Sequence, residues 1–76
     1  WSEDSGAITK RVAFSDYRDT LAFVNAVADI AISEDHHPEI TLGYGHCVIR
    51  YNTHSVGGIS ENDFICAAKL DALFAL

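Results

Sequence analysis

The clearest pattern of hydrophobic and polar positions is helical and runs from Asp16 to about Ser33. Apolar residues recur there at spacings of three and four, which predicts an amphipathic helix. The stripe consists of Tyr17, Leu21, Val24, Ala28 and Ala31, widened by Phe23, Val27 and Ile30. Ser15 is a candidate N-cap, and Asp16 falls in the first turn, where the helix dipole favours a carboxylate. The apolar surface is wide enough to pack on a sheet, with room for a partner as well.

Three other stretches alternate with the period of a β-strand. Residues 8–14 are rich in β-branched and aromatic side chains, which favour strands. Residues 39–44 and 46–51 also alternate, and Gly43 and Gly45 mark a tight turn between them. These two stretches therefore predict a β-hairpin. Residues 1–6 are either a frayed terminus or a brief edge strand anchored by Trp1.

A second helix follows a loop at residues 52–58. Residues 60–63 resemble a capping box, with Asp63 where glutamate or glutamine is usual. The helix is predicted to begin near Asp63 and to cover residues 64–76. The order strand, helix, hairpin, helix predicts an α+β fold, an antiparallel β-sheet with α-helices packed on one face. A chain of 76 residues forms one domain, here 1–76.

Composition narrows the classes of function. The net charge is −6 and the five basic residues are scattered, so direct binding to nucleic acid is not expected. No apolar run approaches the roughly 20 residues of a membrane span, and no signal peptide opens the chain, so we expect a cytoplasmic protein without a membrane segment. Hydrophobic residues make up 49% of this small chain, which favours a homo-oligomer.

The two cysteines lie far apart and form no C-x-x-C pattern. Cys47 and Cys66 are therefore interpreted as reduced, half-buried thiols in a cytosolic protein. A disulfide between them stays open at this point.

Candidate chemistry is concentrated at His36 and His37. Pro38 forces His37 into extended geometry and ends the first helix. Antiparallel pairing across the hairpin sets residue 37 opposite 51 or 52 and residue 36 opposite 52 or 53. His54 then lies roughly 3–7 Å further, at about 3.4 Å per residue. With Asp63 at the start of the second helix, these side chains are predicted to converge at one end of the sheet. His46, at the turn, is predicted to be a surface residue.

Three interpretations of this cluster compete. The residues could be surface and capping groups without chemistry. They could bind zinc, although the familiar ligand spacing on one helical face is missing, and adjacent histidines in an extended chain point to opposite sides. They could carry out general acid–base catalysis on a small heterocycle, because an unperturbed imidazole has a pKa of about 6.5.

The spacing of these residues matches a known signature. That signature is His-His-Pro, an aromatic residue six positions later, a histidine ten further on, and an aspartate nine or more beyond. The matching residues here are His36-His37-Pro38, Tyr44, His54 and Asp63. The flanking segments agree as well: Thr53-His54, Gly57-Gly58-Ile59-Ser60, Asn62-Asp63, Ala13-Phe14-Ser15-Asp16-Tyr17 and Trp1. Over nearly its whole length the chain resembles the pterin-4a-carbinolamine dehydratase family.

The resemblance implies dehydration of 4a-hydroxytetrahydropterin to quinonoid dihydropterin, a lyase reaction in tetrahydrobiopterin biosynthesis. It implies that the pterin is the substrate and that no metal or organic cofactor takes part. By analogy, His36 and His54 are the catalytic acid and base, and Asp63 orients a histidine or bonds the pterin. His37 and Pro38 are assigned to substrate binding. A homodimer or homotetramer is expected from the family.

The chain departs from the family at two points. The family carries an acidic residue four positions before the first histidine, where this chain has Ile32, and Glu34 is two residues away. The family also has a helix before its tryptophan, whereas this sequence starts at Trp1. Some short relatives are non-catalytic assembly factors for a client protein, including the carbon-fixing carboxylase of carboxysomes. That function is the alternative, but the histidines and Asp63 favour catalysis.

Overall fold

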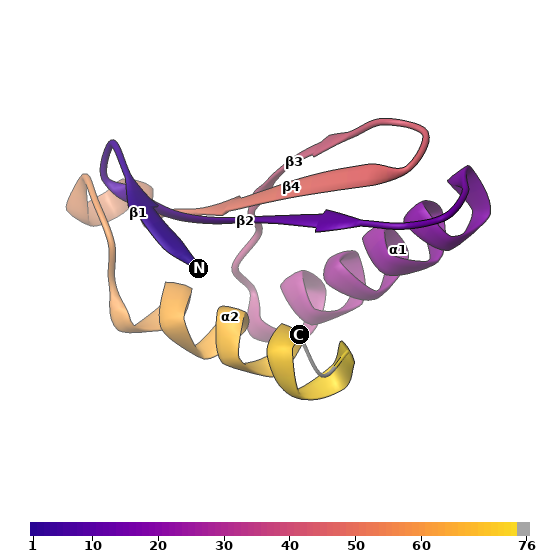
Figure 1. The fold of residues 1–76 in the computed structure, drawn as a ribbon. Coiled ribbons are helices and arrows are strands. Elements are labelled where there is room, and N and C mark those ends of the chain that lie inside the picture. The colour runs from indigo at the N-terminus through magenta and orange to yellow at the C-terminus, as the bar shows by residue number, and fades with distance from the viewer. Residues whose placement is uncertain (75–76) are drawn as a thin grey trace.

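The computed structural model of the chain describes residues 1–74 and shows a sheet with both helices on one of its faces (Figure 1). In chain order the described elements are β1 (Ser2–Asp4), β2 (Ala7–Ala13), α1 (Tyr17–Glu34), β3 (Glu39–Leu42), β4 (His46–Tyr51), a 3-10 turn η1 (His54–Val56) and α2 (Glu61–Phe74). The strands within this range pair antiparallel in the order β1-β2-β4-β3. The predicted α+β class is confirmed.

The observed bounds of the strands differ from the predicted bounds by at most a few residues. The first residues form the brief edge strand, β1, rather than a frayed terminus. Strand β3 ends at Leu42 instead of residue 44, because the turn takes up Tyr44: the Gly43 N–H donates to the His46 carbonyl over 2.9 Å. Strand β4 has the predicted bounds.

Both helices begin differently from the prediction. The N-cap of α1 is Asp16 and not Ser15, because the Asp16 carboxylate accepts the Asp19 N–H over 2.9 Å. Helix α2 begins at Glu61, two residues before the predicted start near Asp63. The predicted capping box forms in part, because Oδ2 of Asp63 accepts the N–H of Ser60, the residue before the helix, over 2.8 Å. Its predicted end at residues 75–76 lies outside the described residues.

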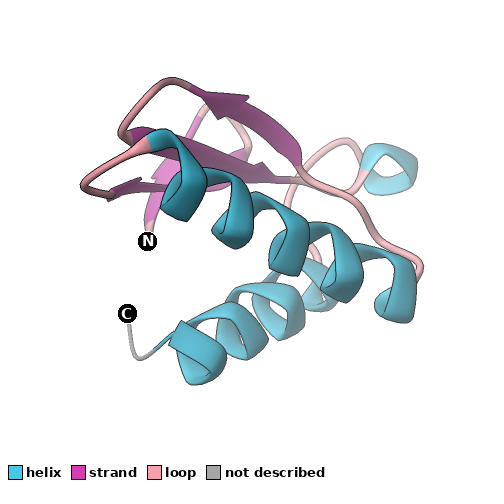
Figure 2. Ribbon diagram, turned by 90° about the vertical axis from the view of Figure 1, so that its right-hand side faces the viewer, coloured by secondary structure: helices cyan, strands magenta, loops and turns pink. Residues whose placement is uncertain are grey.

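The core lies between the sheet and the two helices, which run side by side beneath it (Figure 2). Helix α1 buries Phe23, Val27 and Ala31 of the predicted stripe. Tyr17 and Leu21 of that stripe are exposed instead, and Thr20, which lies outside it, is fully buried. The buried Thr20 hydroxyl donates to the carbonyl of Asp16 over 2.8 Å and also lies 3.0 Å from the carbonyl of Tyr44. A polar residue can be buried there because the turn of the hairpin supplies a partner.

The cysteines are free and fully buried, so the prediction of half-buried thiols is wrong. Cys47 projects from β4 and Cys66 from α2 into the core. Burial raises the pKa of both thiols above the ordinary value, which keeps them protonated and unreactive.

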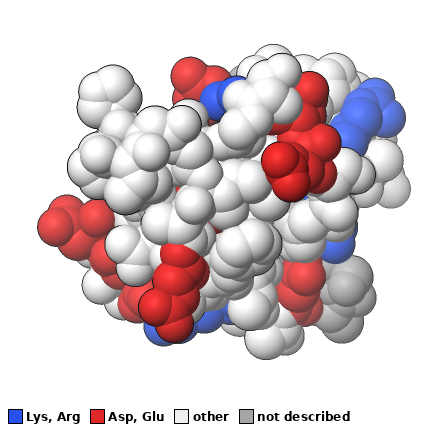
Figure 3. All heavy atoms as spheres, turned by 90° about the vertical axis from the view of Figure 1, so that its left-hand side faces the viewer, with Lys and Arg blue, Asp and Glu red and all other residues white. Residues whose placement is uncertain are grey.

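The surface shows charges of both signs without a continuous basic area on the face drawn in Figure 3. Within the described part of the chain, neither helix has the length and apolar content that a membrane crossing requires.

Candidate active site

A cavity of about 260 Å³ lies beyond the ends of α1 and β4. Its lining residues are Asp35, His36, His37, Asn52, Thr53, His54 and Ser55. Three of the five predicted site residues therefore border one cavity. Asp63 lies behind His36, and Pro38 follows His37 without reaching the lining.

The end of α1 places the paired histidines. Asp35 has left-handed backbone angles, φ 49° and ψ 43°, and ends the helix. The His36 N–H then returns to the Ala31 carbonyl over 3.0 Å. These contacts resemble the usual closing turn of a helix, which normally uses glycine. Pro38 follows, and the chain enters β3 at Glu39.

The register of the hairpin brings the segment after β4, residues 52–54, next to the paired histidines. Glu39 pairs with Arg50 and Ile40 with Ile49. Continued beyond the strands, this register sets residue 37 opposite residue 52 and residue 36 opposite residue 53, within the predicted range. His54 then begins η1 and lies on the same cavity.

His36 is held from two sides. Its Nε2 lies 2.5 Å from Oδ1 of Asp63, and its side chain is 14% exposed. Its ring also stacks on Tyr51, with centroids 5.9 Å apart and an interplanar angle of 14°. An imidazole fixed by a carboxylate and an aromatic face has a defined orientation toward the cavity.

Asp63 is fully buried, with an exposed fraction of 0%. Its Oδ2 accepts the Ser60 N–H over 2.8 Å and the Thr53 hydroxyl over 2.9 Å. A buried carboxylate is tolerated only when such donors replace its hydration. Asp63 therefore caps α2 through Ser60 and, on its other oxygen, holds His36.

Tyr51 lies beneath this site and was missed in the sequence. Its hydroxyl is buried, and no group among residues 1–74 hydrogen-bonds to it, although the Cys66 thiol lies beside it. Burial and the neighbouring Cys66 raise the pKa of Tyr51 well above its ordinary value, so it stays neutral. The sequence did hold a signal for the position of Tyr51. Residues 47, 49 and 51 of β4 lie on the face toward the core, and the same alternation leads on to Thr53 at the cavity.

The remaining histidines differ in their surroundings. His37 and His54 are exposed at the cavity, so they are accessible to a bound molecule. His37 shares that cavity with His36 although adjacent side chains in an extended chain were predicted to point to opposite sides. His46 was predicted on the surface but is half-buried, and its ring packs so closely over Gly43 that a Cβ at residue 43 would collide with it.

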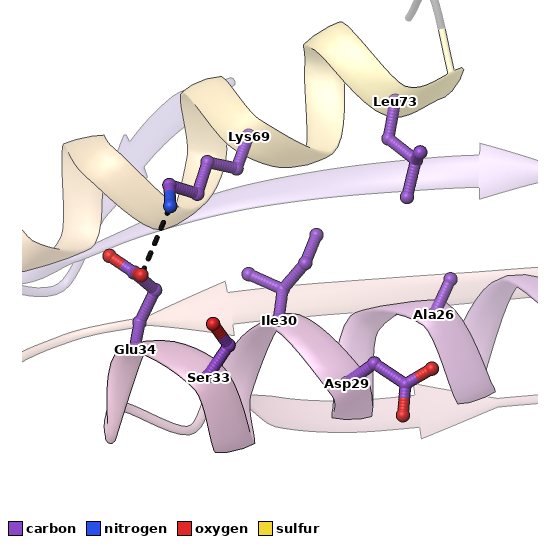
Figure 4. A pocket seen from close by; sticks show the side chains of 7 residues that line it. All are labelled: Ala26, Asp29, Ile30, Ser33, Glu34, Lys69 and Leu73. Atoms are coloured by element: carbon purple, nitrogen blue, oxygen red, sulfur yellow. Dashed lines mark hydrogen bonds and ion pairs between the residues drawn. The ribbon is translucent and has the colours of Figure 1, made fainter.

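Two residues just upstream of the paired histidines, Ile32 and Glu34, lie away from the cavity. Ile32 is 79% exposed on α1 and is not part of the lining. Glu34 points across the gap between the helices, and its carboxylate lies 3.0 Å from Nζ of Lys69 on α2 (Figure 4). Neither Ile32 nor Glu34 therefore contributes to the lining of the cavity.

Histidine and carboxylate side chains prompted the zinc alternative. Within residues 1–74, no three His, Cys, Asp or Glu side chains are grouped so that they could hold a metal ion. What the site does present is a fixed His36–Asp63 pair and two accessible imidazoles on the same cavity, an arrangement suited to proton transfer.

Comparison with known proteins gives the family. Residues 1–73 match the family Pterin 4 alpha carbinolamine dehydratase. A protein of Nitrosospira multiformis, provisionally named pterin-4-alpha-carbinolamine dehydratase, is 55% identical over 76 residues, which are 100% of this chain and 67% of that protein. A protein of Bdellovibrio bacteriovorus with the same provisional name is 57% identical over 77 residues, covering 96% of this chain and 64% of its own length. The chain thus spans about two thirds of the curated relatives that it matches.

Two solved structures share the fold. The transcriptional coactivator/pterin dehydratase from Brucella melitensis superposes with a TM-score of 0.85 at 32% identity, covering 93% of this chain and 76% of that one. A pterin dehydratase-like protein identified as a RuBisCO assembly factor in the alpha-carboxysome gives a TM-score of 0.76 at 29% identity, covering 95% and 83%. The resemblance seen in the sequence is confirmed, and this chain belongs to the pterin 4 alpha carbinolamine dehydratase family.

Proposed function

We propose that this protein dehydrates 4a-hydroxytetrahydropterin to quinonoid dihydropterin by histidine acid–base catalysis. One observation carries the proposal: His36, His37 and His54 border a single cavity, and a buried carboxylate fixes the first of them. The cavity volume of about 260 Å³ lies just below the roughly 300–1,000 Å³ usual for drug-sized ligands, and we propose that it takes a compact bicyclic ring.

The reaction needs two proton transfers and no change of oxidation state. One proton goes to the leaving oxygen on C4a, and one leaves a ring nitrogen, so that water and the quinonoid product balance the substrate. His36 and His54 are proposed as the acid and the base, since they belong to different elements on the same cavity. Because proton transfer alone completes the reaction, neither a metal nor an organic cofactor is proposed.

The other site residues have supporting roles in this proposal. His37, exposed at the cavity, contacts the pterin, and Pro38 keeps the backbone of His37 extended. Asp63 orients His36 and stabilises its protonated form during turnover, as a carboxylate paired with an imidazole does in other acid–base sites. A homodimer or homotetramer and a cytoplasmic location remain predictions from the sequence.

A second candidate function is a non-catalytic assembly factor that binds a client protein. Its support is the likeness to the carboxysomal RuBisCO assembly factor, which extends over 95% of this chain. Against it stands the fixed His36–Asp63 pair, which an assembly role does not require. Catalysis is therefore the preferred proposal.

The direct test is a dehydration assay coupled to an aromatic amino-acid hydroxylase, which generates the 4a-hydroxytetrahydropterin. The wild type should accelerate formation of the quinonoid product, and His36→Ala or His54→Ala should each lower kcat about 100-fold or more. His46→Ala is the matched control, because His46 lies at the far end of the hairpin, and it should keep its activity. A wild-type rate no greater than the spontaneous reaction, with a stable complex formed with a carboxylase client, would favour the assembly factor instead.

A further inference from the structure

A chain of hydroxyl groups leads from Ser60 to the His36–Asp63 pair. Oγ of Ser60 lies 2.5 Å from Oγ1 of Thr53, and Oγ1 of Thr53 lies 2.9 Å from Oδ2 of Asp63. The other carboxylate oxygen of Asp63 lies 2.5 Å from Nε2 of His36. Four side chains from different segments are thus joined in one line of hydrogen bonds.

The chemistry of these groups fixes the direction of the line. An ionised carboxylate only accepts hydrogen bonds, so the single hydroxyl proton of Thr53 is donated to Asp63. Thr53 then has only lone pairs to offer Ser60, and the Ser60 hydroxyl must donate to it. The same reasoning requires His36 to carry a proton on Nε2, which it donates to Asp63.

The backbone of Thr53 makes hydrogen bonds within its own loop, whereas its side chain bonds Asp63. Its N–H donates to the Gly58 carbonyl over 2.7 Å, and its own carbonyl accepts the Val56 N–H over 3.2 Å, which closes the loop that carries His54. Thr53 is the N-cap residue of η1, but its side chain makes no capping bond there. The hydroxyl that would normally cap this turn is instead committed to Asp63.

We infer that Thr53 is a positioning residue that joins the two halves of the site. Through its side chain it orients Asp63 and thereby keeps His36 as the Nε2–H tautomer, with Nδ1 left for a bound molecule. Through its backbone it fixes the loop of His54, so that one residue sets the separation of the two imidazoles. The catalytic consequence rests on the proposed dehydratase function, whereas the tautomer of His36 does not.

The test compares Thr53→Val, which keeps the shape and removes the hydroxyl, with Thr53→Ser, which restores the hydroxyl. Thr41→Val, on exposed strand β3, is the matched control. Nitrogen-15 NMR of the His36 ring, recorded without pterin at a pH where the imidazole is neutral, reports which nitrogen holds the proton. The wild type, Thr53→Ser and Thr41→Val should show the proton on Nε2. Thr53→Val should show a mixture of tautomers and about tenfold faster exchange of the Nε2 proton, as expected for losing a hydrogen bond to a charged group.

Catalysis gives the second readout. Thr53→Val should lower kcat about tenfold with KM changed less than twofold, and Thr53→Ser should recover most of the loss. Ser60→Ala, which removes the outer hydroxyl, should change both readouts in the same direction by about threefold, and it serves if Thr53→Val fails to fold. A wild-type proton on Nδ1, or a His36 spectrum unaffected by these variants, would overturn the inference. An ordered Nε2–H tautomer in a wild type that lacks dehydratase activity would support the positioning role and refute the proposed function.

Discussion

Two hollows formed by residues 1–74 have similar size and different chemistry. The histidine-lined cavity encloses about 260 Å³, and a groove between α1 and α2 encloses about 240 Å³. The groove is lined by Ala26, Asp29, Ile30, Ser33, Glu34, Lys69 and Leu73, none of them a histidine (Figure 4). Its ion pair, Glu34–Lys69, is partly open to solvent, with side chains 26% and 52% exposed.

The difference shows that volume does not identify the site here. In the groove, the charges of Glu34 and Lys69 satisfy each other in a partly solvated pair, which is worth little energy and leaves no group poised for proton transfer. At the cavity, the fully buried carboxylate of Asp63, behind the lining, holds one imidazole while two others stay accessible. Convergent titratable groups at the end of the sheet therefore distinguish the candidate active site from the groove between the helices.

The largest expected difference between the two hollows comes from removing the carboxylate charge that holds a lining residue of each, Asp63 behind the cavity and Glu34 in the groove. Asp63→Asn should lower kcat about 100-fold or more, because the amide cannot stabilise a protonated His36 and favours the wrong tautomer. Glu34→Gln, the matched change in the groove, should leave kcat unchanged. The measurement is steady-state kinetics on both variants, after circular dichroism has verified that each is folded. Equal losses in the two variants would contradict the assignment of the cavity.

Filling each hollow gives a smaller effect. Ser55→Trp places a bulky ring at the cavity, and we expect it to raise KM about tenfold by excluding the pterin. Ser33→Trp fills the groove instead and should leave KM within twofold of the wild type. Kinetic titration with substrate distinguishes these outcomes. A rise in KM for Ser33→Trp alone would move the binding site to the groove.

The smallest expected effect is on the free energy of unfolding, and it comes from Asp71, which lines neither hollow. Asp71 on α2 accepts the Trp1 indole N–H over 2.9 Å and the Lys10 ammonium over 3.2 Å, which ties β1 and β2 to the helix. Partial desolvation raises the pKa of Asp71, but these two donors outweigh it and hold the pKa below its ordinary value of 3.8. A carboxylate whose pKa is lower in the folded than in the unfolded state stabilises the fold at any pH above its unfolded-state pKa. That contribution is lost as the pH falls through its folded-state pKa.

Asp71→Asn should therefore lower the free energy of unfolding at pH 7 by less than about 1 kcal/mol, since the pair is partly exposed. At a pH below the folded pKa of Asp71, the difference from the wild type should shrink toward zero. Urea unfolding at both pH values measures it, and kcat should not change. A loss of stability independent of pH would show that the charge of Asp71 is not what matters.

Much of the fold could be predicted because its patterns are local. Strand β4 has the bounds that were predicted for it. The turn at Gly43–Gly45 allowed the register of the hairpin to be predicted, and that register brings the segment of His54 beside that of His36. The buried face of α1 was predicted in part, since Phe23, Val27 and Ala31 of the predicted stripe are buried. The burial of Thr20 was missed, because its partner is the carbonyl of Tyr44, 24 residues away. No periodicity within the helix can reveal such a distant acceptor.

The site was predictable in part for the same reason. Hairpin pairing was enough to bring the histidines together, and the motif at the start of α2 pointed to Asp63. The contact of Asp63 with Thr53 joins side chains ten positions apart across a loop whose 3-10 turn was not predicted. The position of Ile32 could not be predicted from the sequence either, since only the structure shows that it is 79% exposed and does not line the cavity.

Binding of a stable dihydropterin tests the central claim most directly. In an NMR titration, the account predicts that the backbone amides of Asn52, His54 and Ser55 and the ring of His36 shift and saturate together. The amides of Ala26, Ile30 and Leu73 in the groove should stay in place. Saturating shifts confined to the groove, or no shifts at millimolar pterin, would contradict the claim that the histidine-lined cavity is the pterin site.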